Sequence, residues 1–413
     1  MPCKTFLRHD QTSSQRPSSS SNQVTIYAPS WLREGVNMLG SKLKGVQFQV
    51  YEKPSLKRGR NSSAATQKPL ESFKISEDMN NQSLVLLHKI ARNEPKNTNG
   101  IINLAYYAPD IKDSSLVYFM KDLARQSVVV GKDSTTFCGG YKSPRVQQDG
   151  EPVYVCDLIA LQFQKPYNSG RLVLVQENDI YKGLLDDFIF EHVVGEKKKS
   201  FEEVVNGTDE DSEVKKRYLK HDGYGGRAGT GPCFLDSIAY RKFVETDVLL
   251  CGLALADQAA KNGDKLNFKF LKYGTGYFAG TFVKELNSLI LYGVVDGLEA
   301  LFGRAGNANV VDTIKSLEFP FYECDAENRK RLDELKNRYQ IEYRFSRDDA
   351  LKQTMKGSGL ITATTNCADS NVACGNAMGF KSTDGAIAEN LLSRGNIFCP
   401  NMNNLMTFEY VEI

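Results

Sequence analysis

The sequence predicts an α/β protein with three layers, in which helices cover both faces of a mixed, mostly parallel sheet. Two observations lead to this prediction. The segments 153–163 and 171–176 are nearly continuous apolar runs, as in strands that are buried on both faces. Beyond residue 233, strand-like and helix-like patterns alternate, which is typical of parallel strands joined by crossover helices. The 413 residues suffice for one elaborated α/β domain or for two to three smaller ones.

The individual elements follow from local apolar spacing. Helices are expected over 233–243, 248–261, 281–302 and 328–339. Strands are expected over 100–107, 265–272, 316–322, 341–345 and 360–365. The segment 196–217 is rich in charges of both signs, and we expect it to be a solvated surface loop inserted in the domain.

The charge of the chain is unevenly distributed. The whole sequence has 52 basic and 50 acidic residues, for a net charge of +2. Residues 1–70 alone carry eleven basic and three acidic residues, so their net charge is +8. We therefore expect residues 1–84 to be a basic, Ser-rich and partly disordered N-terminal extension, and residues 85–413 to form the α/β domain.

Composition also argues against several classes of protein. The near-neutral total argues against a dedicated nucleic-acid site. No apolar run approaches the roughly 18 residues of a membrane span, and residues 1–10 lack the apolar core of a signal peptide. The sequence has only four histidines, and its nine cysteines show no CxxC spacing. We therefore expect no metal site and no cofactor. We expect the protein to act in a cytosol, its own or that of a host cell reached by a leaderless route.

Two Gly-rich segments are the strongest functional feature. The segments 221–232 (HDGYGGRAGTGP) and 273–280 (YGTGYFAG) are each expected to lie between a strand and a helix. Glycine lets backbone N–H groups approach a phosphate, and a helix N-terminus adds a favourable dipole; tight turns would explain the same glycines. The candidate binding residues are Asp222, Gly225, Gly226, Gly229, Gly231, Gly274, Thr275, Gly276, Tyr277 and Phe278.

The second segment resembles a known family. FLKYGTGYFAG over 270–280 is similar to the diphosphate-binding loop of macrodomains, in which a strand runs into Ser/Thr-Gly-x-Phe-Gly and then a long helix. Thr275, Gly276, Phe278 and Gly280 match in order, with one extra residue before the last glycine. GGRAGTGP is loosely similar to the other Gly-rich loop of the family. The GGG…QEE signature of the poly(ADP-ribose) glycohydrolase subtype is not present.

This resemblance covers about 222–302 and implies a macrodomain-like fold. It implies ADP-ribose or an ADP-ribosylated protein as the ligand, with ubiquitin or another host protein as the modified partner. It also implies hydrolysis of an ADP-ribosyl bond, as in diverged macrodomain effectors of intracellular bacteria. Tyr277 and Phe278 would then pack on the distal ribose.

Hydrolysis of a glycosidic bond needs carboxylates, and the loop after the last expected strand supplies them. Asp369 and Asn366 lie in NCADSNVACGNAMG over 366–379, and Asp384 follows in STDGAIAEN. Each has a simpler explanation, because Asp384 could cap a helix and Asp369 could form an Asx-turn. The catalytic candidates are therefore Asp369, Asp384 and Asn366.

Two other functions remain open. The protein could bind ADP-ribose as a non-catalytic reader, without hydrolysing the ADP-ribosyl bond. It could instead be a cysteine protease or deubiquitinase, since Cys233 is expected at a helix N-terminus, where the dipole lowers a thiol pKa. His221 or His192 would then assist, although both precede Cys233, unlike the histidine of papain-like enzymes. A buried structural cysteine is the simplest explanation of Cys233.

Overall fold

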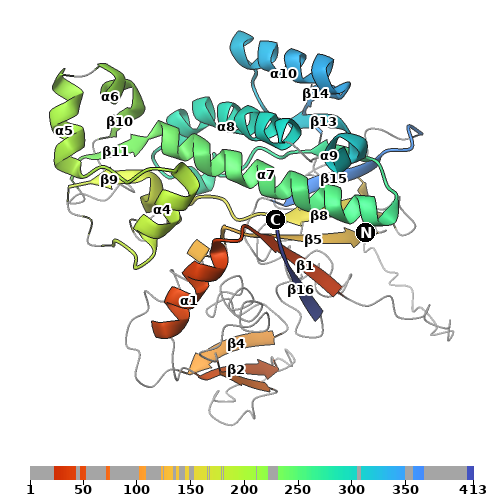
Figure 1. Cartoon of the computed structure of the whole chain (residues 1–413), viewed down its shortest axis with the longest axis horizontal. Coiled ribbons are helices and arrows are strands. Elements are labelled where there is room, and N and C mark those ends of the chain that lie inside the picture. The colour runs from red at the N-terminus through yellow and green to blue at the C-terminus, as the bar shows by residue number, and fades with distance from the viewer. Residues whose placement is uncertain are drawn as a thin grey trace, which may run out of the picture.

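A computed structural model of the chain describes residues 23–42, 47–52, 71–74, 102–107, 122–123, 125–133, 136–138, 145–147, 153–164, 166, 168–177, 179, 181–210, 212–221, 231–304, 308–348, 357–366 and 407–413 (Figure 1). The central element is an eight-stranded sheet. Its strand order is β14 (Glu342–Ser346), β13 (Ile314–Pro320), β12 (Leu266–Lys269), β15 (Ile361–Asn366), β8 (Val153–Asp157), β5 (Val128–Asp133), β1 (Gln23–Ala28) and β16 (Thr407–Glu412). Only β5 runs antiparallel to its neighbours in this sheet. The predicted α/β class and the mixed, mostly parallel sheet are confirmed.

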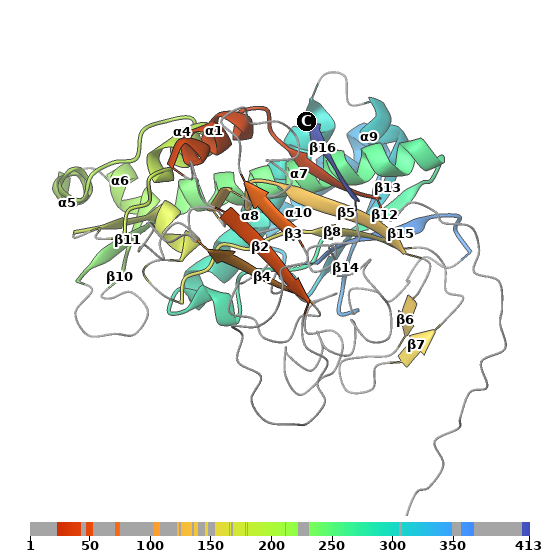
Figure 2. The same ribbon diagram turned by 90° about the horizontal axis from the view of Figure 1, so that it is seen from below.

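One face of this sheet is covered by a pair of long helices, α7 (Ser237–Asn262) and α8 (Val283–Gly303) (Figures 1 and 2). Tyr27 donates a hydrogen bond from the sheet to Asp257 of α7 at 2.6 Å, and Tyr154 donates one to Asp264, two residues beyond the end of α7, at 2.5 Å. The helices approach closely because α8 presents glycines: a Cβ at Gly297 would lie 2.6 Å from a carbon of α7. A helical layer on the opposite face is not part of the described structure, so the third layer stays a prediction.

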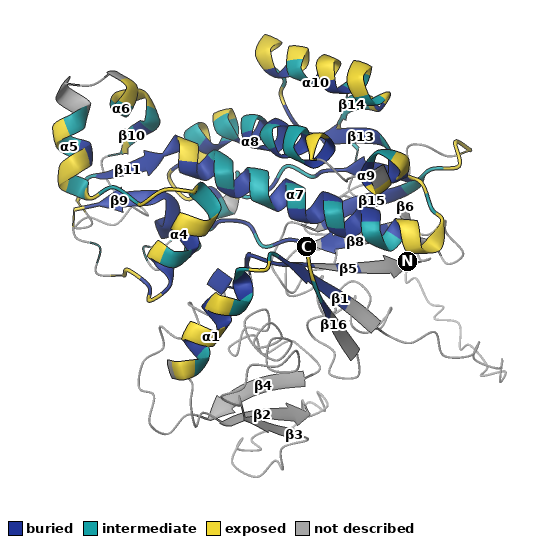
Figure 3. Ribbon diagram, viewed as in Figure 1, coloured by how far each residue is buried: buried dark blue, intermediate teal, exposed yellow. Residues whose placement is uncertain are grey.

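The expected helices over 233–243 and 248–261 are one continuous helix. It begins at Ser237, where the side chain of Asp236 accepts a hydrogen bond from the N–H of Ala239 at 3.0 Å. The helices expected over 281–302 and 328–339 are α8 and α10 (Ala326–Tyr339), and α9 (Ala308–Thr313) follows α8. Figure 3 shows α7 largely buried, whereas the outer side of α10 faces solvent.

The sheet face opposite the long helices is polar in its β12–β13–β14 part. Lys269 and Glu318 stand opposite each other on β12 and β13, with Nζ and Oε1 3.3 Å apart and both side chains fully buried. Arg344 on β14 donates to the other carboxylate oxygen of Glu318 at 2.6 Å. Burial lowers the pKa of Lys269. The carboxylate of Glu318 thus compensates the buried Lys269, which would otherwise be costly to bury, and also pairs with the partly exposed Arg344.

A second, three-stranded sheet consists of β10 (Tyr218–His221), β11 (Cys233–Asp236) and β9 (Leu174–Gln176), preceded by the short 3-10 helix η2 (Ser169–Val173). The expectation of a solvated loop over 196–217 is wrong, because this segment forms α5 (Phe201–Glu210) and α6 (Ser212–Arg217). Its few apolar side chains share one side and pack against the buried Val175, Tyr218 and Phe234. The many charges hid this amphipathic pattern.

The segment before residue 85 contributes to the main sheet. Strand β1 pairs with both β5 and β16, and α1 (Leu32–Lys42) follows it. The boundary expected at residue 84 therefore does not separate an extension from the domain. The smaller elements are β2 (Gln47–Glu52), β3 (Glu71–Lys74), β4 (Ile102–Tyr107), β6 (Thr136–Cys138), β7 (Arg145–Gln147) and α4 (Asp186–Val194).

The long helix α8 also bears on the membrane expectation. By length and composition it is apolar enough to cross a bilayer, contrary to the expectation from apolar runs alone. In the structure, 56% of its apolar window is buried, and it packs along α7. A buried core helix passes the same test, so α8 is weak evidence for a membrane span.

Candidate functional site

The candidate site lies at the carboxyl edge of the parallel strands. Strand β12 leads outward to β13 and β14, whereas its neighbour β15 precedes β16 at the far end of the sheet. The sheet thus changes its winding direction between β12 and β15, which is where open α/β sheets bind ligands. The segment 270–282, which contains the second Gly-rich loop, follows β12 at this edge, and the segment 158–164 follows β8.

The second Gly-rich loop packs tightly on the segment after β8. The N–H of Phe163 donates to the carbonyl of Phe278 at 2.6 Å. Gly280 has φ +57°, and a Cβ there would lie 2.6 Å from the carbonyl oxygen of Phe163. Gly276 differs, because its φ is not positive and a Cβ would meet none of the described residues within 4 Å. Neither packing nor backbone conformation explains glycine at 276, so its open backbone is available to a ligand.

This loop and the helix after it present unused N–H groups. Within the part of the chain that the structure describes, the N–H groups of Thr275 and Gly276 donate no hydrogen bond. Helix α8 begins directly after the loop, and Phe282 at its N-cap provides no side-chain cap. Uncapped first-turn N–H groups and the helix dipole favour an anion at this position, whereas the carboxylate of Glu285 in the same turn opposes one.

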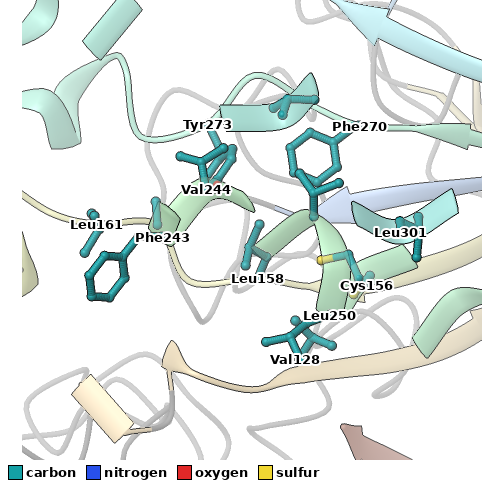
Figure 4. Close-up of a cluster of buried hydrophobic side chains, with 14 of the residues drawn as sticks. Val128, Cys156, Leu158, Leu161, Phe243, Val244, Leu250, Phe270, Tyr273 and Leu301 are labelled. Atoms are coloured by element: carbon teal, nitrogen blue, oxygen red, sulfur yellow. The ribbon is translucent and has the colours of Figure 1, made fainter. Parts of the chain in front are cut away.

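The base of the loop is anchored to α7. The hydroxyl of Tyr273 donates to Asp247 at 2.6 Å, and Arg125 donates to the same carboxylate oxygen at 2.7 Å. Burial raises the pKa of Asp247 to about 6, although Arg125 and Tyr273 oppose the shift. Figure 4 shows Tyr273 and Phe270 in the buried apolar cluster that also contains Phe243, Val244 and Leu250 of α7. The loop therefore rests on a buried, charged hydrogen-bond network.

The first Gly-rich loop differs from the prediction. It leads into strand β11 and not into a helix, so it is the loop of a β10–β11 hairpin closed by the pair His221 and Cys233. Of its candidate residues only Gly231 is described: it is exposed, has φ +67°, and a Cβ there would lie 3.5 Å from Oε2 of Glu177. Asp222, Gly225, Gly226 and Gly229 lie outside the described residues. No helix dipole acts on this loop at Cys233.

The two Gly-rich loops nevertheless meet. The ring of His221, directly before the first loop, packs on the ring of Phe282, directly after the second loop, with centroids 4.5 Å apart. Phe282 also contacts Phe163 at 5.4 Å between centroids. The structure therefore brings together the start of one loop and the end of the other, at the carboxyl edge of the sheet.

The environment of Cys233 contradicts a thiol activated by a helix dipole. Cys233 is fully buried in β11, four residues before α7 begins. Its register partners are Gln176 on β9 and His221 on β10, so these three residues form one row across the sheet. His192 lies on α4, where its ring contacts Phe188 and Trp31 at 4.2 and 5.1 Å between centroids.

The predicted catalytic residues fall mostly beyond the described chain. Asp369 and Asp384 lie outside the described residues. Asn366 is the last residue of β15 and pairs in register with Asp157, the last residue of β8. The backbone of Asn366 is therefore at the carboxyl edge, as expected. Gly274, with φ +68°, and Thr275, Gly276, Tyr277 and Phe278 lie in the loop described above.

Two carboxylates that sequence reasoning missed lie in a cavity beside the first loop. The cavity has a volume of about 640 Å³ and lies between the end of β9 and α5. Its lining includes Glu177, which also lies beside Gly231, and Asp179. Burial raises the pKa of Asp179 and lowers that of Lys198, another lining residue. The sequence carried no signal for these residues, because isolated charges in a loop are ordinary.

A buried ionic cluster adjoins this cavity at Lys198. Lys198 donates to the carbonyl oxygen of Arg171 at 2.9 Å. The guanidinium of Arg171, itself fully buried, bridges Asp122 and Asp186, with Nη2 to Oδ1 of Asp186 at 2.7 Å. Burial raises the pKa of Asp122 to about 6 in spite of this pairing. The cluster ties the segment before β5 to α4, and Lys198, which lines the cavity, is bonded to the backbone of its central residue.

Comparison with known proteins does not assign a family. No protein-family model and no curated protein matches this chain. A macrodomain relationship therefore stays a prediction from the sequence motif over 270–280.

Proposed function

We propose that this protein binds ADP-ribose, or an ADP-ribosylated protein, at the carboxyl edge of its sheet and hydrolyses the ADP-ribosyl bond. The diphosphate would lie on the loop over 274–278 and on the N-terminus of α8. One observation carries the proposal: within the described part of the chain the N–H groups of Thr275 and Gly276 donate no hydrogen bond, and α8 begins without a side-chain cap seven residues after Gly276, at the point where the sheet changes its winding direction.

The electrostatics of this edge suit a diphosphate. A diphosphate presents several oxygen acceptors and negative charge, which backbone N–H groups and a helix dipole both stabilise. The open space at Gly276 allows an oxygen to approach the backbone closely. The contact between His221 and Phe282 brings the end of β10 beside the start of α8, and the first Gly-rich segment continues the chain from His221.

Hydrolysis would break the bond from the ribose C1″ carbon to the protein side chain. Water would supply the hydroxyl group that C1″ gains, and a proton would pass to the leaving side chain. Asp369 and Asp384 follow β15 in the chain and remain the proposed catalytic carboxylates, with Asn366 positioning the water. Glu177 is a described alternative, because its carboxylate lies beside Gly231. Asp179 could act as the acid, since burial raises its pKa.

Calorimetric titration with ADP-ribose tests the binding step. We expect binding by the full chain and at least a ten-fold loss of affinity in Gly276→Ala, because the added methyl group would stand where the phosphate approaches. Gly303→Ala is a matched control, since this exposed glycine at the other end of α8 has no positive φ and a Cβ there would meet only the hydroxyl of Tyr339, at an ordinary contact distance of 3.7 Å. No binding at millimolar ADP-ribose would refute the proposal.

Turnover needs a separate measurement. Release of ADP-ribose from a modified protein should be abolished in Asp369→Ala while most of the binding is retained. If Asp369→Ala hydrolyses normally, Glu177→Gln and Asp179→Asn become the next variants. If the wild type binds ADP-ribose but releases none, the protein is a reader and the hydrolase proposal fails.

A thiol hydrolase is the second candidate, favoured by the row of Gln176, Cys233 and His221 across the three-stranded sheet. Residues directly opposite in antiparallel strands have Cβ atoms about 5 Å apart, within reach of a thiol–imidazole contact. The full burial of Cys233 argues against it. Labelling of native Cys233 by a thiol-directed probe, with loss of turnover in Cys233→Ala, would favour this candidate over the carboxylate mechanism.

A further inference from the structure

The cavity between β9 and α5 has the size of a small-molecule site. Strand β9 lies beside α5 (Figure 1), and Val175 packs there against Phe201 and Val205. These apolar side chains line a cavity of about 640 Å³, which is within the usual range of ligand pockets. The described lining residues also include five carboxylates and three lysines. The cavity thus combines an apolar wall, charges of both signs and an excess of negative charge.

Some of these charges already have partners within the protein. Nζ of Lys182 lies 2.6 Å from Oδ2 of Asp187. The carboxylate of Glu203 accepts a hydrogen bond from the N–H of Ser200 at 2.6 Å, as in a capping box at the start of α5. Lys182, Asp187 and Glu203 are therefore engaged without any ligand.

Asp179 and Lys198 differ, because they line the same cavity without pairing. Among the residues that the structure describes, neither forms an ion pair. Oδ1 of Asp179 is buried and accepts no hydrogen bond. Nζ of Lys198 donates to the carbonyl oxygen of Arg171 at 2.9 Å. An ammonium group has three donors, so Lys198 keeps two of them for a ligand.

The two groups influence each other electrostatically. Burial raises the pKa of Asp179 and lowers that of Lys198, and the charge of each opposes the shift of the other. A charged group that is buried without a partner is costly. A ligand that carries both charges would compensate both groups at once, whereas a simple anion or cation would compensate only one of them.

Both groups are held in place by the surrounding fold. The carbonyl oxygen of Asp179 accepts the N–H of Lys182 at 3.3 Å, in the turn before α4. Lys198 is bonded to the backbone of Arg171, whose guanidinium is fully buried. A site whose charged groups are already positioned loses less entropy when a ligand binds.

We propose that this cavity binds a free α-amino acid with a cationic side chain. Its α-carboxylate accepts hydrogen bonds from Nζ of Lys198, and its α-ammonium group donates to Oδ1 of Asp179. Glu177 and Glu202 also line the cavity and form no ion pair with a described residue, so their charge favours the cationic side chain. This inference does not rest on the proposed function, and a failure to bind ADP-ribose would leave it standing.

Calorimetric titration of the full chain with L-lysine tests the inference. We expect L-lysine to bind. Nα-acetyl-L-lysine, which lacks the α-ammonium group, and L-lysinamide, which lacks the carboxylate, should each bind at least about ten-fold more weakly. L-leucine, which lacks the cationic side chain, should also bind more weakly than L-lysine. No binding of L-lysine at millimolar concentration, or equal binding of the two analogues, would overturn the inference.

Two substitutions assign the two contacts. Asp179→Asn should bind L-lysine at least about ten-fold more weakly and should no longer distinguish it from its Nα-acetyl form. Lys198→Met should no longer distinguish L-lysine from L-lysinamide. Lys182→Met is the matched control, because this lysine also lines the cavity but already pairs with Asp187, so the affinity should stay within about two-fold of the wild type.

Urea denaturation separates a lost contact from a damaged fold. The Asp179 carboxylate is destabilised by burial, so Asp179→Asn should not lower the denaturation midpoint at pH 7. A lower midpoint would show that Asp179 stabilises the fold itself, and it would overturn the assignment of this carboxylate to a ligand. Unchanged selectivity between L-lysine and its Nα-acetyl form in a folded Asp179→Asn would overturn it as well.

Discussion

Replacing Tyr273 by phenylalanine tests whether the buried network under the second Gly-rich loop holds that loop in place. The substitution removes one oxygen atom and no carbon, so it creates almost no cavity. It deletes the hydrogen bond of 2.6 Å from the hydroxyl to Asp247 and leaves Arg125 as the remaining partner of that carboxylate in the described structure. Asp247 and Arg125 are each 1% exposed, so water cannot replace the lost donor.

The expected loss follows from the burial of both groups. A hydrogen bond to a charged group contributes about 1.5–3 kcal/mol, and we expect Tyr273→Phe to lose about 2 kcal/mol of unfolding free energy at pH 7.5. Tyr343→Phe is the control, because its hydroxyl also bonds a carboxylate, Asp333, at 2.6 Å, but near the surface. Water can replace that bond, so the control should lose no more than about 0.5 kcal/mol.

The pH dependence of this loss has a definite sign. Burial raises the pKa of Asp247 to about 6, so protonation of this carboxyl favours the folded state below that pH, and the contribution is lost as the pH rises through 6. The hydroxyl of Tyr273 lowers this pKa, so Tyr273→Phe should raise it further. The variant should therefore lose more stability at pH 7.5 than at pH 5, as measured by urea denaturation. Equal losses in the two variants, or a larger loss at pH 5, would refute the reasoning.

Two further substitutions test packing at the sheet. Gly280→Ala should destabilise by about 2–3 kcal/mol, because its Cβ would lie 2.6 Å from the carbonyl oxygen of Phe163 at a φ of +57°, whereas Gly276→Ala should stay within about 0.5 kcal/mol of the wild type in urea denaturation. Glu318→Gln should lose about 3 kcal/mol or more at pH 7, because the buried Lys269 loses its counter-charge. Burial already lowers the pKa of Lys269, so the folded state sheds this proton first and its stability rises with pH. The loss in Glu318→Gln should therefore shrink at pH 10, and a constant loss would contradict this account.

Local patterns were sufficient for much of the main sheet. Apolar spacing predicted the segments that form β12, α8, β13, α10, β14 and β15. Each element buries either one side or both faces, so its apolar residues follow a regular pattern in the sequence. The same reasoning failed over 196–217, where charges outnumber the few apolar side chains that α5 and α6 turn toward Val175 and Phe234. It failed again at Cys233, where an apolar run that reads as the start of a helix pairs with β9 and β10 as a strand.

Pairing between segments that are far apart in the sequence decided the remaining features of the fold and of the candidate site. The sequence by itself determined that a Gly-rich segment follows a buried strand and precedes a long helix, since glycine content and apolar periodicity are local properties. Only the tertiary structure decided that His221 contacts Phe282 and that Tyr273 bonds to Asp247. Those outcomes depend on strand order and register, which the close packing of groups far apart in the chain determines.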